Sequence, residues 1–375
     1  MRATILKKNF QEGLALAERV VPKTPTLPIL SAVLCSVESN FIQISATDLE
    51  IGIRYKILSK NEQEGSFAVP PRPLGQFVGT LPEGPVALEK KEGGLAIGAG
   101  EFQAVFKTLD AEEFPIIPLA KGDENQTHVD AASFCDALAS VAGFVGQSQA
   151  RPEISGVLFS FDKKTLTLAS TDSFRLAEKT VPLLKETPGP QVCILPAKAS
   201  RELLALLGDR PGVLKIFISP TQIIFHYGQD GRPGEPEIQL VSRVIEGEYP
   251  KYQEVVPASF ETTCVFSRGD LLERVKAAGI FSGKMQDVLL AFDPGKKRVE
   301  ISTKNPTIGE QHSFLGGDMQ GQKLEISFNW RFLADGLAQT KGDHMQFLLS
   351  SAEGPALIKS AQDPSYFYVL MPLKI

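Results

Sequence analysis

The 375-residue chain has the composition of a globular protein of two to four domains, because 43% of its residues are apolar and 22% are charged. No apolar run approaches the roughly 18 residues that suggest a membrane span, and the N-terminus lacks a signal-peptide pattern, so we expect a cytoplasmic protein. The net charge of −5 excludes a uniformly basic surface, and it permits DNA contact only where positive charge gathers on one face.

One order of elements occurs three times along the chain. It starts with an amphipathic helical stretch, whose apolar residues recur at three- and four-residue spacing, at 6–21, 130–146 and 267–283. A pair of strands joined by a short polar turn follows at 31–48, 156–172 and 288–304. A strand that runs into a second helix then follows at 67–82, 192–211 and 324–340. Asp130 and Ser267 are expected to cap two of the first helices.

This repeat predicts an α+β protein with three tandem copies of one domain, each with two helices packed on antiparallel sheet. The expected domains are residues 1–120, 128–253 and 254–375, with polar linkers at 119–128 and 253–260. A period near 125 residues, as from Phe67 to Val192, indicates globular domains and not a solenoid of small repeats.

The sequence offers no motif for a metal, a cofactor or a catalytic centre. The cysteines are scattered without a CxxC pair, and we expect reduced thiols in the core at Cys35, Cys135, Cys193 and Cys264. The histidines are equally dispersed, and no HExxH, GxSxG or Gly-rich phosphate loop is present. Asp48 and Asp172 each follow a threonine at equivalent places, where Lys304 stands in the third repeat; we expect both carboxylates to bond local backbone at a strand end. We therefore expect no enzyme.

Short motifs in a fixed order along the chain resemble the bacterial DNA polymerase III beta subunit family. They are TLPILS (26–31), ATDLEI (46–51), LPEG (81–84), EFP (113–115), TDSFRLA (171–177), GEYPKY (247–252) and YVLMPL (368–373). The resemblance implies a head-to-tail homodimer whose six domains close a ring around duplex DNA, with helices lining the hole. It also implies a non-catalytic processivity factor without cofactors. The implied partners are duplex DNA, the replicative DNA polymerase, the clamp loader and other proteins with a clamp-binding motif.

A ring that holds DNA by topology needs only sparse basic side chains inside, because phosphate contacts carry no sequence information. The candidates for DNA contact are Lys23, Arg72, Gln149, Arg151, Lys198 and Arg201, of which Lys198 and Arg72 are favoured by family position. A wider set comprises Lys7, Lys8, Arg19, Arg268, Arg274, Lys276 and Arg331. The alternative for each residue is a solvated surface charge.

The resemblance further implies a pocket for partner peptides between the second and third domains. Its matching residues are Ile154, Thr171, Leu176, Pro250, Val255, Val369, Met371 and Pro372, with Arg175 and Ser173 at the rim. Apolar walls with a flexible methionine suit an extended peptide with apolar anchors, and ordinary core packing is the alternative. Phe174 and Glu254 stand where relatives often carry His and Arg, so the preferred peptide stays open. Ile280 and Phe281 are implied at the dimer interface, with a core role as the alternative.

Two other functions are compatible with the sequence. A hydrolase or transferase on tandem α+β domains would need a convergent catalytic set, which the sequence does not offer. A clamp-like structural protein without polymerase binding would fit the departures at Phe174 and Glu254. Binding of a polymerase-tail peptide distinguishes this last reading from the processivity factor.

Overall fold

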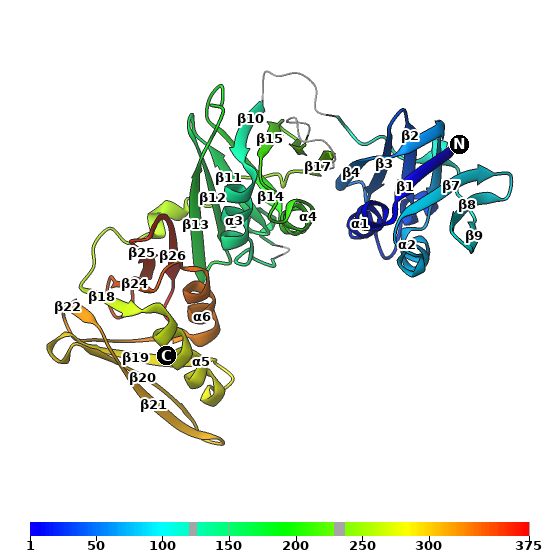
Figure 1. Cartoon of the computed structure of the whole chain (residues 1–375). Coiled ribbons are helices and arrows are strands. Elements are labelled where there is room, and N and C mark those ends of the chain that lie inside the picture. The colour runs from blue at the N-terminus through cyan, green and yellow to red at the C-terminus, as the bar shows by residue number, and fades with distance from the viewer. Residues whose placement is uncertain (120–125, 149, 229–236, 375) are drawn as a thin grey trace. The chain divides into compact units, whose positions relative to one another are not determined.

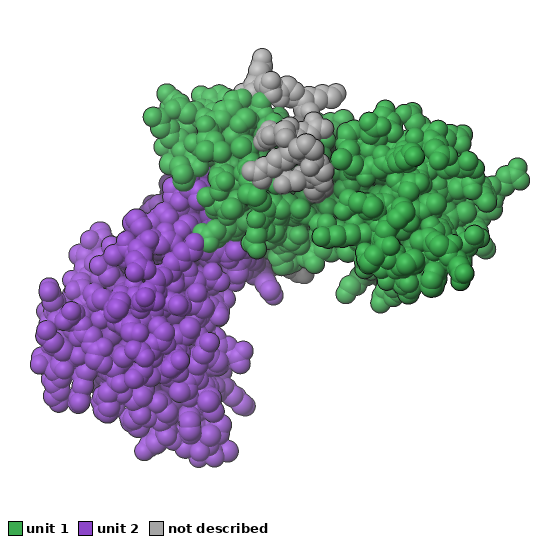
Figure 2. Space-filling model, in the orientation of Figure 1, with its two compact units in different colours: residues 1–136, 161–165, 182–246 green, residues 137–160, 166–181, 247–375 purple. Residues whose placement is uncertain are grey.

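The computed structural model describes residues 1–119, 126–148, 150–228 and 237–374, whose helices and strands are labelled in Figure 1. These residues form two compact units. The first unit comprises residues 1–136, 161–165 and 182–246, and the second comprises residues 137–160, 166–181 and 247–375 (Figure 2). The units do not coincide with the three sequence repeats, because the middle repeat contributes to both.

The helices of the first unit bury the apolar stripes that the sequence predicts. α1 (Lys7–Glu18) turns Phe10, Leu14 and Ala17 inward and packs on α2 (Pro71–Thr80), β3 and β4. α2 starts with a proline, which is tolerated in the first turn because its missing N–H has no partner there. α4 (Ala197–Leu207) follows the strand β14 (Gln191–Pro196) directly. α3 (Ala131–Ala142), whose residues divide between the two units, begins after Asp130, whose Oδ1 accepts from Ser133 N at 2.8 Å, which confirms the predicted N-cap.

Two sheets build the first unit. One has the strand order β5 (Lys60–Gln63), β1 (Arg2–Leu6), β7 (Pro85–Lys91), β8 (Gly94–Ala99) and β9 (Phe102–Phe106). The other has the order β10 (Gln126–Asp130), β15 (Val213–Ile218), β16 (Gln222–Tyr227), β17 (Glu237–Arg243), β4 (Ile51–Leu58), β3 (Phe41–Thr47), β2 (Val33–Glu38) and β6 (Gly65–Val69). β17 pairs antiparallel with β4, with Leu240 opposite Ile53, so one sheet passes from the second repeat into the first.

The linker prediction at 119–128 was wrong at its C-terminal end. β10 begins at Gln126, and the side chains of Gln126 and Thr127 are buried in the sheet. The three residues 126–128 are polar by type but pair with β15, where Thr127 lies opposite Ile216. Polar composition alone therefore misplaced the start of this strand.

The second unit also contains two sheets. The longer one runs through β11 (Gly156–Phe161), β12 (Thr165–Thr171), β13 (Arg175–Pro182), β26 (Asp363–Leu370), β25 (Ala356–Ser360), β24 (His344–Leu349), β18 (Thr262–Ser267) and β22 (Asp318–Gly321). The shorter one has the order β21 (Gly309–Gly316), β20 (Arg298–Asn305), β19 (Asp287–Asp293) and β23 (Leu324–Asn329). β13 pairs antiparallel with β26, with Leu176 opposite Val369, so this sheet joins the second repeat to the third.

Helices α5 (Arg268–Phe281) and α6 (Trp330–Gln339) pack against each other, and α5 also packs on β20 and β21. Ser267 caps α5, as predicted, by accepting from Asp270 N, and Asn329 caps α6. A Cβ on Gly279 would lie 2.4 Å from the Trp330 ring, so glycine permits this helix contact.

Every helix and strand pair that the repeat predicts is present in all three copies. All four cysteines are free and buried, which confirms the prediction of core thiols. Burial raises the pKa of Cys135, Cys193 and Cys264 to about 12 and raises that of Cys35 further. Within the described part of the chain, no helix is both long and apolar enough to span a membrane.

Candidate functional site

A cleft of about 550 Å³ in the first unit gathers four basic side chains from distant parts of the sequence. Arg19 and Lys23 come from the end of α1 and the segment after it. Arg72 and Lys198 are the second residues of α2 and α4, so the two helices place their cations equivalently. The cleft thus unites three of the predicted DNA-contact residues with Arg19 from the wider set.

Two of these cations are paired with carboxylates of the neighbouring repeat. Lys198 Nζ donates to Asp48 Oδ2, and Arg19 Nε donates to Glu202 Oε2 at 2.6 Å. Asp48 and Glu202 are each only 11% exposed in the side chain, whereas Lys198 is 43% and Arg19 47% exposed. The carboxylates therefore lie behind the cations, and the cations face solvent.

Asp48 sits in a tight corner between β3 and β4. Its Oδ1 accepts from Glu50 N at 3.0 Å and from Ile51 N at 2.7 Å, while Thr47 Oγ1 accepts from Leu49 N. Leu49 takes a positive φ of 76° within this turn. The predicted structural role of the Thr-Asp pair is confirmed, because both side chains bond local backbone.

The second repeat contains the same corner between β12 and β13. Asp172 Oδ1 accepts from Phe174 N and Arg175 N, both at 3.0 Å, and Ser173 has a φ of 79°. Thr171 Oγ1 donates to Arg175 O at 2.7 Å. The role predicted for Asp172 is confirmed by the same bonds.

The other residues predicted to contact DNA are more dispersed. Arg201 is exposed on α4 but does not line the cleft. Arg151 belongs to the second unit, where it bonds Glu153 at 3.2 Å and Ser173 Oγ at 3.1 Å. Gln149 lies outside the described residues. Lys7, from the wider set, is buried and donates to Leu81 O at 2.6 Å, so its ammonium is not available to a phosphate.

Several of the residues predicted for the peptide pocket lie at the junction of β13 and β26 in the second unit. Arg175 lies opposite Leu370 and Leu176 opposite Val369, and Met371 N donates to Phe174 O at 2.9 Å. The strand pair therefore extends one step beyond β26, and it fixes the backbone of Met371 beside the Asp172 corner.

Gly146 ties two further pocket residues together, and the sequence reading missed it. Its N–H approaches both Ile154 O, at 2.8 Å, and Thr171 O, at 3.1 Å. A Cβ at this position would lie 2.7 Å from Ile154 Cδ1, so a larger residue would force the Ile154 side chain to move. A glycine shortly after the end of α3 was the available sequence signal.

Burial divides the predicted pocket residues into two groups. Ile154, Leu176 and Val369 are buried, as their alternative role in the core expects. Ser173, Val255 and Met371 are exposed, and Thr171, Arg175, Pro250 and Pro372 are half-buried. Phe174 is 61% exposed, so this departure from the family pattern presents an aromatic ring to solvent.

The guanidinium of Arg175 is held by two aromatic rings and two carboxylates of the second unit. It lies 4.2 Å from the Phe332 ring centroid and 5.0 Å from that of Phe144. Its Nε and Nη1 donate to Asp172 at 2.9 Å and to Asp335 at 2.6 Å. Burial lowers the pKa of Arg175, but the hydrogen bonds to the two carboxylates outweigh it, and the pKa is raised. The sequence reading missed the partners on α6 and after α3.

Ile280 is 70% exposed and Phe281 is half-buried at the end of α5. For Ile280 the alternative role in the core of the third repeat was wrong, because most of its side chain faces solvent.

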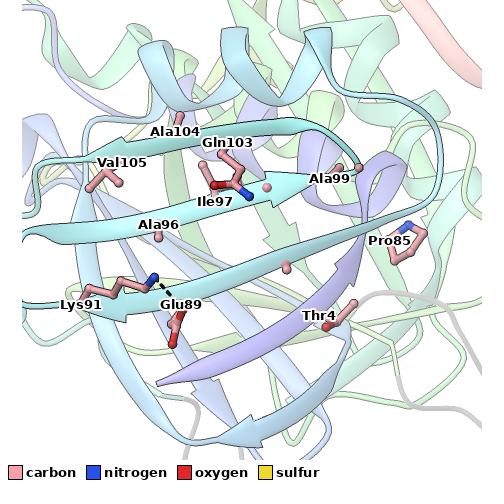
Figure 3. A pocket seen from close by; sticks show the side chains of 13 residues that line it. Thr4, Pro85, Glu89, Lys91, Ala96, Ile97, Ala99, Gln103, Ala104 and Val105 are labelled. Carbon is pink, nitrogen blue, oxygen red and sulfur yellow. Dashed lines mark ion pairs between the residues drawn. The ribbon is translucent and has the colours of Figure 1, made fainter.

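A second hollow, of about 490 Å³, lies along β7, β8 and β9 (Figure 3). Small side chains such as Ala87, Ala96 and Ala104 line it, and its Lys91 ammonium pairs with Glu89 at 3.2 Å. The hollow therefore offers little charge for a phosphate. Among the residues that the structure describes, no group of three His, Cys, Asp or Glu side chains could hold a metal ion.

Comparison with known families accounts for almost the whole chain. The models of the N-terminal, central and C-terminal domains of the DNA polymerase III beta subunit match residues 1–118, 128–251 and 253–374, respectively. The chain belongs to the DNA polymerase III beta subunit family. The α+β fold class with three clamp domains is thereby confirmed.

The chain matches relatives of this family over its full length, with low sequence identity. The beta sliding clamps of Synechococcus elongatus and Pseudomonas putida are 24% and 27% identical over 384 and 378 residues, and each match covers 100% of both chains. The crystal structure of a sliding clamp from Pseudomonas aeruginosa bound to griselimycin has a TM-score of 0.93 and 26% identity, with 100% of both chains covered.

Proposed function

We propose that the chain is a processivity factor, a sliding clamp that encircles duplex DNA and tethers the replicative polymerase to it. The observation that carries this proposal is the end-to-end match of three clamp domains to a family whose relatives are named beta sliding clamps. The proposed domains are residues 1–120, 128–253 and 254–375. The clamp acts in the cytoplasm without a cofactor and catalyses no reaction itself.

Two copies, associated head to tail, form the proposed ring, with Ile280 and Phe281 covered by the first domain of the partner copy. Inside it, Lys23, Arg72, Arg151, Lys198 and Arg201, together with Gln149, meet phosphates. The contacts are sparse and independent of sequence, so topology holds the DNA while the ring slides. The exposed side chain of Ile280 and the basic cleft support this arrangement.

We expect a particle of about 80 kDa, twice the 40.7 kDa of one chain, when light scattering follows size exclusion at micromolar concentration. Replacement of Ile280 by Asp should shift the mass toward one chain, because a charge would be desolvated in the interface. Lys276→Asp, at an exposed position on the same helix, is the matched control. A single-chain mass for the unaltered protein would contradict the dimer.

Topological holding predicts a difference between DNA forms. After loading onto nicked circular DNA, the clamp should remain bound through gel filtration at about 0.2 M salt, where individual phosphate contacts are weak. Cutting the circle with a restriction enzyme should release most of it, because the ring slides off the ends. Equal retention on circular and linear DNA would rule out encirclement.

The second proposed site takes peptides from the polymerase, the clamp loader and other clamp-binding proteins. A short polymerase-tail peptide should bind with micromolar affinity, and removal of residues 371–375 should weaken it at least tenfold. The deletion takes away Met371, Pro372 and the bond from Leu373 N to Ser327 O. Fluorescence anisotropy of a labelled peptide measures this, and the mass of the truncated protein checks that it still dimerises. Absence of binding by the full chain would favour the clamp-like structural protein. The exposed Phe174, which departs from the family pattern, is the observation that supports this alternative.

A further inference from the structure

We propose that Asp48 and Glu202 compete with DNA phosphate for the cations of the basic cleft, and that they limit how tightly the clamp holds duplex DNA. This inference rests on the proposed function, because it concerns the strength of the same DNA contact. In this proposal the cations attract DNA phosphate, and the two carboxylates weaken that attraction.

The two ion pairs are built alike, each from an exposed cation and a shielded carboxylate. Lys198 bonds Asp48, and Arg19 bonds Glu202 at 2.6 Å. Each pair joins the first repeat to the second, with the carboxylate shielded and the cation about half exposed. A phosphate that approaches from solvent therefore meets a cation whose charge is already compensated from behind.

Asp48 is unable to turn away from Lys198 without breaking its corner. Its Oδ1 is occupied by the N–H groups of Glu50 and Ile51, so only Oδ2 is left for Lys198. The carboxylate is thus a fixed anion bonded to one of the cations that line the cleft. A phosphate must either displace it from Lys198 or share the ammonium with it, and each choice weakens the contact.

The remaining two cations of the cleft stand in neither of these pairs. Lys23 and Arg72 are exposed and supply the attraction that brings a phosphate into the cleft. Two of the four cations that line the cleft are thus paired with carboxylates. A weak and easily exchanged grip is what a ring needs in order to move along DNA.

Asp48→Asn tests the proposal cleanly, because asparagine keeps the Oδ1 acceptor of the corner and removes the charge beside Lys198. Binding of the full-length protein to a fluorescent duplex of about 30 base pairs is measured by anisotropy over a series of salt concentrations. We expect the affinity at low salt to rise about three- to tenfold. The slope of log affinity against log salt should steepen by about one, the value for one additional phosphate contact. Glu202→Gln should act in the same direction through Arg19.

Glu12→Gln is the matched control. Glu12 pairs with Arg210, also between the first and second repeats, yet neither residue lines the cleft. The variant changes the net charge by the same amount, and we expect less than a twofold change in affinity. An equal gain in Glu12→Gln would assign the effect to net charge and overturn the proposal.

Lys198→Ala supplies the second check, because Asp48→Asn should add nothing in its background. A lower affinity of Asp48→Asn would show that the carboxylate positions Lys198 for phosphate, and it would overturn the proposal. If the unaltered protein binds the duplex and neither Asp48→Asn nor Glu202→Gln changes the affinity, the proposed competition is refuted, but the proposed DNA contact is not. Absence of binding in all proteins at the lowest salt refutes the proposed DNA contact as well.

Discussion

Replacement of Arg175 by alanine should destabilise the second unit by about 3 kcal/mol. Removal of one partner from a buried ion pair typically destabilises by about 3–5 kcal/mol, and an Arg–aromatic contact adds about 0.5–2 kcal/mol. The lower end applies because Asp335 is 55% exposed and is well solvated without Arg175, whereas Asp172 is only 18% exposed. Phe144 and Phe332 would each lose their contact with the guanidinium.

The only tryptophan, Trp330, reports this effect, because it is the first residue of α6 in the same unit. Urea unfolding followed by its fluorescence gives the free energy of unfolding. Arg151→Ala is the control at an exposed ion pair, with an expected loss of about 0.5 kcal/mol or less. A loss below about 1 kcal/mol for Arg175→Ala would show that the contacts of its guanidinium contribute little.

Lys179→Met should destabilise the same unit by about 3–4 kcal/mol, since it leaves the carboxylate of Asp363 buried without its cation. Lys179 Nζ lies 2.5 Å from Asp363 Oδ2, and the two side chains are 8% and 10% exposed. The pair connects β13 with β26. Urea unfolding on the Trp330 signal measures the loss, and the double variant with Asp363→Asn should recover at least half of it. No recovery would show that the lysine acts through its packing and not through its charge.

Acid should reduce the difference between Lys179→Met and the unaltered protein. Burial raises the pKa of Asp363, but the hydrogen bonds of Lys179 and Ser365 outweigh it and hold the pKa below the ordinary value of 3.8. Stability from a depressed carboxyl pKa is present above the unfolded value and is lost as the pH falls through the folded value. The unaltered protein therefore loses stability below about pH 4, whereas the unpaired carboxyl of the variant gains a proton and loses its penalty. Unfolding at pH 7 and at about pH 3 compares the two proteins.

Local patterns predicted the helices and the strand pairs of the repeat. The helix at α1 follows from the spacing of Phe10, Leu14 and Ala17, and the corners follow from Asp48 and Asp172 beside threonine. These features depend on neighbours within a few residues, so the sequence displays them directly. The threefold order of elements then indicated the domain number.

The partners of the candidate sites are distant in sequence, and periodicity carries no information about them. Asp48 meets Lys198 and Arg175 meets Asp335 only because sheets and helices of neighbouring repeats come together. The prediction favoured Lys198 and Arg72 by family position, and the structure places both side chains in one cleft as the second residues of their helices. It did not show that a carboxylate already holds Lys198, or that Arg175 bonds Asp335.

The pairing of β4 with β17 has a practical consequence for dissection of this protein. A recombinant fragment that ends at residue 120 lacks β17 and would leave the apolar strand Ile51–Leu58 with a bare edge. Bare strand edges recruit other chains and promote aggregation. Isolated fragments cut at the sequence repeats would thus be poor surrogates for the intact polypeptide, and mapping of partner sites calls for point substitutions in the full-length protein.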